Sequence, residues 1–434
     1  MTGTSGLAHV VLAPGRERRV RGGHPWVFAT EVARVQGAPE PGDIVDVLTA
    51  RGGFLGRGYI NPASQILVRL LTRRPDEAVD EEFFRRRVRE AVEYRVRLLA
   101  SGVLAASATS DPARRAFRLV FAESDGLPAL VVDYFAGVLV FQALALGVDR
   151  RKELLLRLVR EEVSRHFPVA GVWERDDAPV RELEGLPLTA GPFWGDPPPR
   201  VTIHESGLDL VVDIGRGQKT GYFLDQSANR AAAAAAVRAA AGGPRVLDCF
   251  CYTGAFALAA ARAGAAEVVG VDTSAEALEL ARENAALNGF SGPDDPAGPA
   301  RAGGPGDGPQ VSFVEANVFD FLRQEEAQGR RWDVVLLDPP AFAKNRAALP
   351  GALRGYKEIN LRAMRLIPPG GYLVTSSCSQ HLSEELFLEV LADAAADTRR
   401  RVRVVEVRGQ AADHPFLPAA PETRYLKMAV LRVD

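Results

Sequence analysis

The chain has few cysteines and no long apolar run. Only three of its 434 residues are cysteine, too few for a disulfide framework, so reduced thiols and a cytoplasmic location are expected. No stretch approaches the about 20 consecutive apolar residues that a membrane-spanning helix needs. The first residues also lack a basic segment followed by an apolar one, so we expect neither a signal peptide nor a membrane partner.

Histidine content and net charge are low as well. The six histidines are scattered and no Cys/His spacing resembles a zinc site, so no metal is expected. A net charge of −2 gives the whole chain no attraction to a polyanion. Residues 1–74 differ, with ten arginines against five acids, and Arg16, Arg18 and Arg19 lie close together there. Because nucleic acid is attracted by local basic patches, this segment is a candidate RNA-binding surface; a solvated face, or arginine richness from genomic base composition, is the alternative.

The length and the changing pattern along the chain predict three domains. Residues 1–72 consist of short apolar segments between Gly and Pro turns, which indicates a small all-β barrel. Residues 73–200 combine a long helical stretch, Asp80–Leu99, with several strand-like segments, which indicates an α+β domain. Residues 201–434 alternate strands and helices, which predicts an α/β domain with a parallel sheet covered by helices on both faces.

The expected strands of the third domain end at one common edge, where ligands bind in such sheets. These strands are Arg245–Phe250, Glu267–Val271, Val311–Glu315, Asp333–Leu337 and Gly371–Ser376, and the helices are Gly254–Ala263, Ala275–Leu287, Phe319–Gln324 and Gly355–Leu366. Ser291–Gln310 is rich in Gly, Pro and Asp and is expected to be a disordered surface loop. Polar residues that directly follow the strands are therefore the candidates for a site.

Two such residues point to a nucleoside-containing cofactor. Asp248 comes at the end of one strand and is followed by a turn that includes Gly254, and Asp272 ends the next strand, where an acid suits both hydroxyls of a ribose. A dinucleotide site is the rival interpretation, but it needs a glycine-rich turn for its pyrophosphate. This turn has one glycine and the bulky Phe250 and Tyr252, which favours S-adenosylmethionine.

A third motif follows the strand Asp333–Leu337. Asp338-Pro339-Pro340-Ala341-Phe342 holds a carboxylate stiffly, because two prolines fix their φ angles and remove two backbone donors. Such a carboxylate can bind the Watson–Crick edge of a base, and Phe342 can stack on it. We therefore take Asp338, Pro339, Pro340 and Phe342 as candidates for binding the substrate base; a plain strand-ending Pro-Pro turn is the alternative.

Together these motifs resemble the class I methyltransferases of the ribosomal RNA large subunit methyltransferase I family. The segments that carry the resemblance are Gly221–Gln226 with Asn229 and Arg230, Asp248–Gly254, Asn288–Phe290 and Asp338–Phe342. The resemblance covers essentially the whole chain. It implies a PUA-like RNA-binding domain over residues 1–72, a middle domain over 73–200 and a Rossmann-like catalytic domain over 201–434.

The resemblance also implies the cofactor, the substrate and the residues that bind them. The cofactor is S-adenosylmethionine, the partner is 23S rRNA and the reaction is methylation of cytosine at C5. The implied cofactor-binding residues are Phe223, Asp225, Asp248, Tyr252, Thr253, Gly254, Asp272, Asn317 and Asp338. Asn317 departs from the family, which usually has an acid there to contact the adenine amino group; an amide oxygen can still accept that bond.

Methylation at C5 needs a nucleophile, and Cys378 is the candidate. A thiolate that adds to C6 makes C5 reactive toward the methyl donor. Cys378 lies in the polar turn Ser376-Ser377-Cys378-Ser379 directly after a strand, where a thiol can be reactive, and the family has a matching Ser-Cys-Ser element. Cys249 and Cys251 are rivals in the cofactor turn and are expected to be packing residues. Asp338 would then bind N3 and the amino group of cytosine.

Other interpretations stay open at this stage. Asp-Pro-Pro-aromatic motifs also serve amino groups, so a guanine or adenine nitrogen methyltransferase is the alternative within the same class. An inactive RNA-binding assembly protein is the alternative of another class, although Asp248, Asp272, Asp338 and Cys378 argue against it. The sequence leaves the oligomeric state open, a homodimer included.

Overall fold

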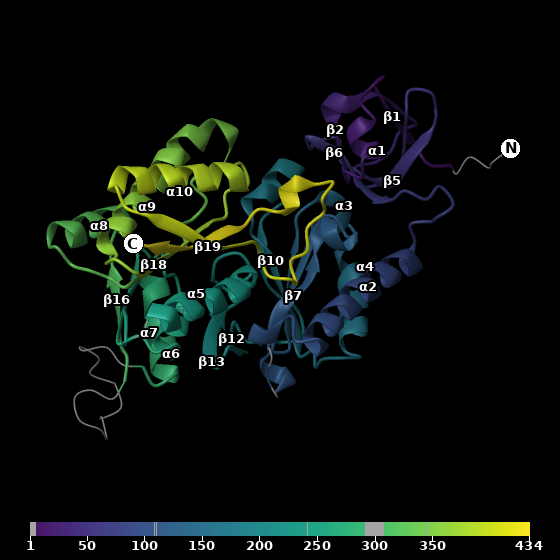
Figure 1. Cartoon of the computed structure of the whole chain (residues 1–434). Helices are drawn as coiled ribbons and strands as arrows, with labels where there is room; N and C mark the ends of the chain where they lie inside the picture. Colours follow the sequence, from purple (N-terminus) through teal and green to yellow (C-terminus); the bar gives the residue numbers. More distant parts are fainter. Residues whose placement is uncertain (1–5, 108, 110, 241, 291–307, 344) are drawn as a thin grey trace. The chain divides into compact units, whose positions relative to one another are not determined.

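This computed structural model describes residues 6–107, 109, 111–240, 242–290, 308–343 and 345–434 (Figure 1). The chain forms two compact units. The first contains the described residues up to Ile203, together with Val212–Leu224 and Ala412–Thr423, and the second contains His204–Val211, Asp225–Ala411 and Arg424–Asp434. The three-domain division stays a prediction.

The first unit begins with a six-stranded sheet in the order β2-β6-β5-β4-β1-β3. Its strands are β1 (His9–Leu12), β2 (Trp26–Phe28), β3 (Val32–Gln36), β4 (Ile44–Leu48), β5 (Phe54–Ile60) and β6 (Ile66–Thr72), with the short helix α1 (Arg18–Arg21) after β1. All pairs are antiparallel except β1 with β4. A small core of Val, Leu and Ile side chains fills its inner face. The all-β expectation is confirmed; β2 and β3 are short and were not predicted.

The same unit contains a five-stranded sheet in the order β11-β10-β9-β8-β7, with the long helices α2 (Glu81–Ala100) and α4 (Lys152–Val163). Its strands are β7 (Ala116–Phe121), β8 (Leu130–Phe135), β9 (Val138–Ala143), β10 (Gly171–Asp176) and β11 (Thr189–Trp194), and a short helix, α3 (Leu146–Asp149), follows β9. The Asp80 carboxylate caps α2 by accepting the Phe83 amide hydrogen at 2.9 Å. The α+β expectation for this region is therefore confirmed. A two-stranded sheet, β12 (Arg200–Glu205) and β13 (Leu208–Asp213), follows where the chain passes between the units.

The second unit is built on a seven-stranded sheet in the order β16-β15-β14-β17-β18-β20-β19. Its strands are β14 (Arg245–Cys249), β15 (Glu267–Asp272), β16 (Gln310–Glu315), β17 (Val334–Leu337), β18 (Gly371–Ser377), β19 (Val402–Arg408) and β20 (Lys427–Val433). The first five strands in this order are parallel, but β20 runs antiparallel to both β18 and β19. The five predicted strands are thus parallel, as expected, and β19 and the antiparallel β20 were not predicted. An antiparallel partner needs no crossover helix, and the chain after α10 returns through β19 and β20 without one.

Helices cover both faces of this sheet, as expected. They are α5 (Ser227–Ala240), α6 (Ala255–Arg262), α7 (Ala275–Leu287), α8 (Val318–Ala327), α9 (Leu349–Leu366) and α10 (Glu384–Thr398). Figure 1 shows α9 and α10 on one side of the strands and α5, α6 and α7 on the other. Strand β17, Val-Val-Leu-Leu, is buried throughout, as a central parallel strand must be. Of the expected loop Ser291–Gln310, residues 291–307 lie outside the described residues.

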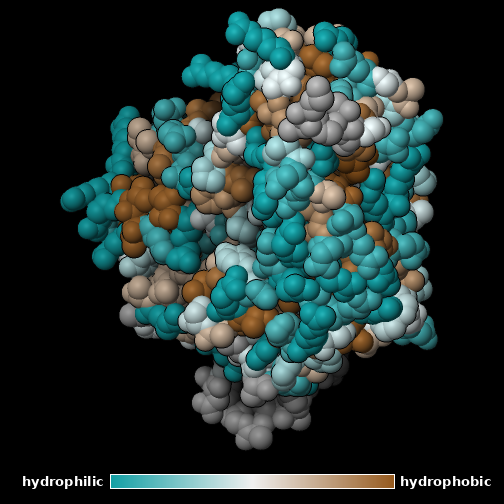
Figure 2. All heavy atoms as spheres, turned by 90° about the vertical axis from the view of Figure 1, so that its right-hand side faces the viewer, coloured by the Kyte–Doolittle hydropathy of each residue, from teal (hydrophilic) through white to brown (hydrophobic). Residues whose placement is uncertain are grey.

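Among the described residues, no helix is long and apolar enough to cross a membrane. On the face drawn in Figure 2, hydrophobic residues lie in patches separated by hydrophilic ones.

Candidate active site

The turn between β14 and α6 has an unusual backbone. Phe250, Tyr252 and Gly254 all have positive φ, at 65°, 50° and 82°. For the two aromatic residues this conformation costs about 1–2 kcal/mol each. Backbone hydrogen bonds hold it in place: the amides of Phe250 and Cys251 donate to the Val271 carbonyl at 2.8 and 3.1 Å. The turn is therefore fixed against the end of the neighbouring strand β15.

Asp272, at the end of β15, completes this attachment. Its carboxylate accepts the amide hydrogens of Tyr252 at 2.9 Å and Ser274 at 3.0 Å. The side chain is half-buried, so lone pairs on both oxygens can accept further donors. The pair of ribose hydroxyls predicted as its ligand fits this geometry.

Asp248 is a buried carboxylate near the end of β14. It is 1% exposed, and neither carboxylate oxygen has a hydrogen-bond partner of good geometry among the described residues. Burial raises the pKa of Asp248 well above its usual value, and the carboxylates of Asp338 and Asp272 add to the effect. The Ala257 amide opposes this rise, but it is weak compensation for a buried carboxylate, so the side chain is suited to a ligand that brings a positive charge or donors.

The other predicted cofactor residues differ in burial and in the contacts that they already make. Thr253 is buried, and its carbonyl accepts from the Asn284 side chain at 3.3 Å. The amide oxygen of Asn317 caps α8 by accepting the Phe319 amide hydrogen at 2.9 Å, so its predicted contact with adenine stays a prediction. Asp225 is buried and accepts from the Tyr425 hydroxyl. Phe223 belongs to the first unit, and its part in a cofactor site also stays a prediction.

The Asp338 carboxylate is held by a chain of side-chain amides. Gln226 Nε2 donates to Asp338 Oδ1 at 2.7 Å, and Asn229 Nδ2 donates to Gln226 Oε1 at 2.6 Å. Pro339 is buried, Pro340 is exposed, and the Phe342 ring lies 4.7 Å from the ring of Tyr356 between centroids. The motif is thus rigid at its start and packed at its end.

Cys378 lies next to this motif. Strand β18 pairs with β17, and the Cys378 Sγ is 3.9 Å from the Pro339 carbonyl oxygen. Two hydrogen bonds fix the turn, because the buried Tyr356 hydroxyl is 2.9 Å from both Ser377 Oγ and Ser379 Oγ. The structure therefore brings the candidate nucleophile and the candidate base-binding motif together. His381 is exposed.

The other two cysteines are buried in the cofactor turn. Burial raises the pKa of both Cys249 and Cys251 well above the usual value, and the Asp248 carboxylate adds to the effect. Neither is therefore suited to ionise at neutral pH.

Sequence reasoning missed several residues that organise this edge. Gln226 was named only as part of a motif. Nothing in the sequence indicated that this Gln, just before an Ala-rich helix, contacts Asp338, which follows a strand. Tyr356 and Lys427 were not predicted, because a lone Tyr in a helix and a lone Lys in a strand carry no local signal. Lys427 is buried and donates to the Ser379 carbonyl at 2.7 Å.

The candidate RNA-binding arginines lie in the first unit and differ in exposure. Arg16 and Arg18 are exposed. Arg19 is an ion-pair partner of Glu31 at 2.8 Å and lies over the Phe28 ring at 4.4 Å from its centroid. Arg19 therefore has a structural role in this sheet, whatever else it binds.

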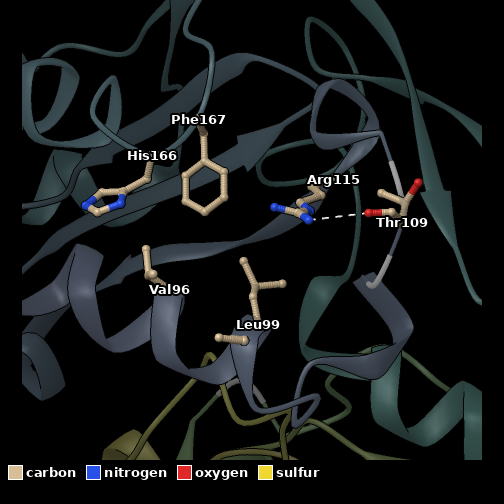
Figure 3. A pocket seen from close by; sticks show the side chains of 7 residues that line it. Val96, Leu99, Thr109, Arg115, His166 and Phe167 are labelled. Carbon is tan, nitrogen blue, oxygen red and sulfur yellow. Dashed lines mark hydrogen bonds between the residues drawn. The ribbon is translucent and has the colours of Figure 1, made fainter.

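A separate cavity of about 540 Å³ lies in the first unit and is drawn in Figure 3. Val96 and Leu99 of α2 lie at one side of it, and His166, Phe167 and Arg115 lie at the other. The Arg115 guanidinium donates to the Thr109 carbonyl at 3.3 Å. None of the site residues predicted from the sequence lines this cavity. Among the described side chains, no group of three His, Cys, Asp or Glu is placed to hold a metal ion.

Comparison with known proteins assigns the family. A family model of PUA-like domains matches residues 10–73, and one of S-adenosylmethionine-dependent methyltransferases matches residues 189–421. Proteins named ribosomal RNA large subunit methyltransferase I from Shewanella denitrificans, Shewanella amazonensis and Erwinia tasmaniensis are 43%, 44% and 40% identical, each over 98% of this chain and 99% of the relative. The chain belongs to the ribosomal RNA large subunit methyltransferase I family.

Solved structures agree with the fold of this methyltransferase. A protein named as a SAM-dependent methyltransferase from Streptococcus mutans has a TM-score of 0.76 at 17% identity, covering 98% of this chain and all of that one. A methyltransferase solved in complex with SAH has a TM-score of 0.78 at 18% identity and the same coverage. The resemblance read from the motifs is confirmed, and the cofactor is S-adenosylmethionine.

The residues at the sheet edge fit this cofactor. S-adenosylmethionine carries a sulfonium and an ammonium, which suit the buried carboxylate of Asp248, and a ribose, which suits Asp272. It carries no phosphate, so the crowded turn with Phe250 and Tyr252 is no obstacle. The roles of the individual cofactor residues remain predictions.

Proposed function

We propose that this methyltransferase forms 5-methylcytosine in 23S rRNA, with Cys378 as the nucleophile. The observation that carries the proposal is the short approach of Cys378 Sγ to the Asp338-Pro339-Pro340 segment, 3.9 Å from the Pro339 carbonyl. A nitrogen methyltransferase needs a carboxylate at this place but no thiol. The relatives named for large-subunit rRNA support the RNA substrate.

The chemistry assigns a task to each residue. The Cys378 thiolate adds to C6 of cytosine, and the electron pair of the C5–C6 double bond makes C5 nucleophilic. S-adenosylmethionine supplies the methyl group that C5 accepts. The proton on C5 then leaves to a base, the double bond re-forms and the C6–S bond breaks, which returns Cys378 as a thiolate.

Asp338 binds and orients the base in this proposal. One carboxylate oxygen accepts a hydrogen bond from the cytosine amino group, and a proton on the other oxygen would donate to N3. Hydrogen bonding at N3 withdraws electrons from the ring and favours thiolate addition at C6. The Gln226 amide at 2.7 Å fixes the direction of the carboxylate. The Phe342 ring packs against Tyr356, so the exposed part of this ring would stack on the base.

We further propose that residues 1–72 form the RNA-binding domain, 73–200 the middle domain and 201–434 the catalytic domain. The match of the PUA-like family to residues 10–73 supports the first boundary. Arg16 and Arg18 are exposed there and suited to phosphate contacts, which provide affinity without reading sequence.

Mechanism-based trapping tests the proposal. Large-subunit rRNA with 5-fluorocytosine at the target should form a covalent adduct with the full chain, because fluorine does not leave as a proton does. Peptide mapping should place the adduct on Cys378. Methylated rRNA without an adduct, with the new methyl group on a guanine or adenine nitrogen, would refute the C5 proposal in favour of nitrogen methylation at Asp338. Cofactor binding without methylation of any RNA would favour the assembly protein.

A further inference from the structure

A buried lysine lies beside the Ser-Cys-Ser turn. Lys427, the first residue of β20, is the register partner of Ser377 in the antiparallel pair β18–β20. It is 3% exposed, and its Nζ donates to the carbonyls of Ser379 at 2.7 Å and Tyr425 at 2.8 Å. Its side chain thus runs from the level of Ser377 to that of Ser379. The ammonium therefore contacts the backbone of the residue that directly follows Cys378.

Two neutral carbonyls are weak compensation for a buried ammonium. Burial lowers the pKa of Lys427 to about 8, and the Cys378 thiolate is the first of the groups that oppose this fall, ahead of Glu384. The Lys427 amine is therefore largely protonated at neutral pH. Because electrostatic interaction between two groups is mutual, the ammonium stabilises the thiolate as much as the thiolate stabilises the ammonium.

The other charged groups around Lys427 largely compensate one another. Arg424 lowers the pKa of Lys427 and Glu384 raises it, and these two form an ion pair at 2.5 Å. Tyr356 faces the turn from α9 as a neutral phenol, because burial raises its pKa. Cys378 is thus the first of the charged groups that favour the protonated form of Lys427.

We propose that Lys427 is a positioning residue that holds Cys378 as a thiolate. The proposal rests on the role of Cys378 as the nucleophile. When Cys378 ionises, its proton goes to solvent and Lys427 keeps its own. The ammonium favours the thiolate before it adds to C6, and it favours the thiolate again as the leaving group when the C6–S bond breaks. Through the Ser379 carbonyl it also fixes the backbone next to the sulfur.

Alkylation of the full chain by iodoacetamide tests this, with Cys378 followed by peptide mass spectrometry across a range of pH. In Lys427→Gln, which keeps an N–H donor but removes the charge, the pH of half-maximal alkylation should rise by about one unit, so the rate at neutral pH falls about tenfold. Lys427→Arg keeps the charge and should restore most of the rate. The control is Lys357→Met, which removes a lysine paired with Asp397 at 2.9 Å and should leave the profile unchanged.

A second measurement uses the unaltered lysine and does not depend on the folding of Lys427 variants. In Cys378→Ser, the pKa of Lys427, followed by NMR of labelled lysine, should fall below about 8 because the thiolate is gone. An unchanged alkylation profile in Lys427→Gln, or an unchanged lysine pKa in Cys378→Ser, would overturn the inference. Neither result touches the trapping of 5-fluorocytosine by Cys378, so failure of this inference and failure of the proposed function can be told apart.

Discussion

Two turns at the same edge of one sheet each contain cysteine, yet their surroundings are opposite. The turn after β14 buries Cys251 next to the carboxylate of Asp248, and burial with this charge raises the pKa of the thiol. The turn after β18 leaves Cys378 half-exposed, and Lys427 lies beside it. Both sulfurs are close to where the parallel strands end, so position alone does not decide which one reacts.

Burial is the larger cause of the raised pKa of the Cys251 thiol, and the sign of the nearest buried charge is a second difference between the two turns. A carboxylate beside a thiol opposes ionisation of the thiol wherever the carboxylate is itself charged, and an ammonium favours it. If the acids of the cofactor turn bind a cationic ligand, as predicted, their charges disfavour a reactive thiol in the same turn. The nucleophile that we propose, Cys378, follows a strand two positions away in the sheet, where β20 brings a lysine.

Replacing the cysteine of each turn by serine should give the largest difference in turnover between the two turns. Cys378→Ser should lower turnover by about a thousandfold or more, because a serine hydroxyl is scarcely ionised at neutral pH. Cys251→Ser should keep turnover within a few fold, since this side chain only packs. Methyl transfer to rRNA from labelled S-adenosylmethionine measures both. Equal losses in the two variants, with cofactor binding intact, would contradict the division of roles.

Removing Asp272, the acid that ends β15, should weaken cofactor binding and leave the turn with Cys378 unaffected. Asp272→Ala should weaken S-adenosylmethionine binding about 10- to 100-fold, because hydrogen bonds to a charged group contribute about 1.5–3 kcal/mol. It should leave alkylation of Cys378 unchanged. Asp320→Ala, which removes an exposed acid paired with Arg323 at 2.8 Å, is the control for the charge change in calorimetry. Cofactor affinity that stays equal in both variants would exclude Asp272 as a ligand.

The sequence was most informative where local patterns carry the structure. The apolar run Arg245–Phe250 and the periodic segment Ala275–Leu287 predicted β14 and α7 closely, because strands buried on both faces and amphipathic helices have local signatures. The antiparallel β20 was missed. Strand direction depends on a pairing partner that is distant in the chain, and a parallel and an antiparallel central strand have similar sequences.

The same limit applies to the site. Asp248, Asp272, Asp338 and Cys378 were predicted because each directly follows or ends a strand, and the structure places these strand ends at one edge. The residues that hold them were not found. Gln226, Tyr356 and Lys427 act through contacts with residues 112, 23 and 48 positions away, which no spacing rule predicts.

The smallest predicted effect is the pH dependence of stability and of cofactor affinity, which we expect to depend on Asp248 in the cofactor turn alone. In the free protein, burial and the neighbouring carboxylates raise the pKa of Asp248, so the folded chain retains a proton that the unfolded chain has released. The free protein should accordingly lose stability as the pH rises above the ordinary carboxyl range. A cationic ligand favours the charged carboxylate, so binding should expel the proton.

S-adenosylmethionine affinity should therefore increase with pH until the free Asp248 side chain is itself ionised, by at most about tenfold per pH unit for one proton. Calorimetry between about pH 5 and pH 8, in two buffers of different ionisation enthalpy, measures both the affinity and the proton released. In Asp248→Asn the amide imitates the protonated acid, so affinity should be lower and independent of pH. Lys427→Gln should leave the dependence intact, because its charge acts on the other turn. A pH dependence that survives Asp248→Asn and disappears in Lys427→Gln would mean that the two turns share one titrating group, and the electrostatic separation argued above would be wrong.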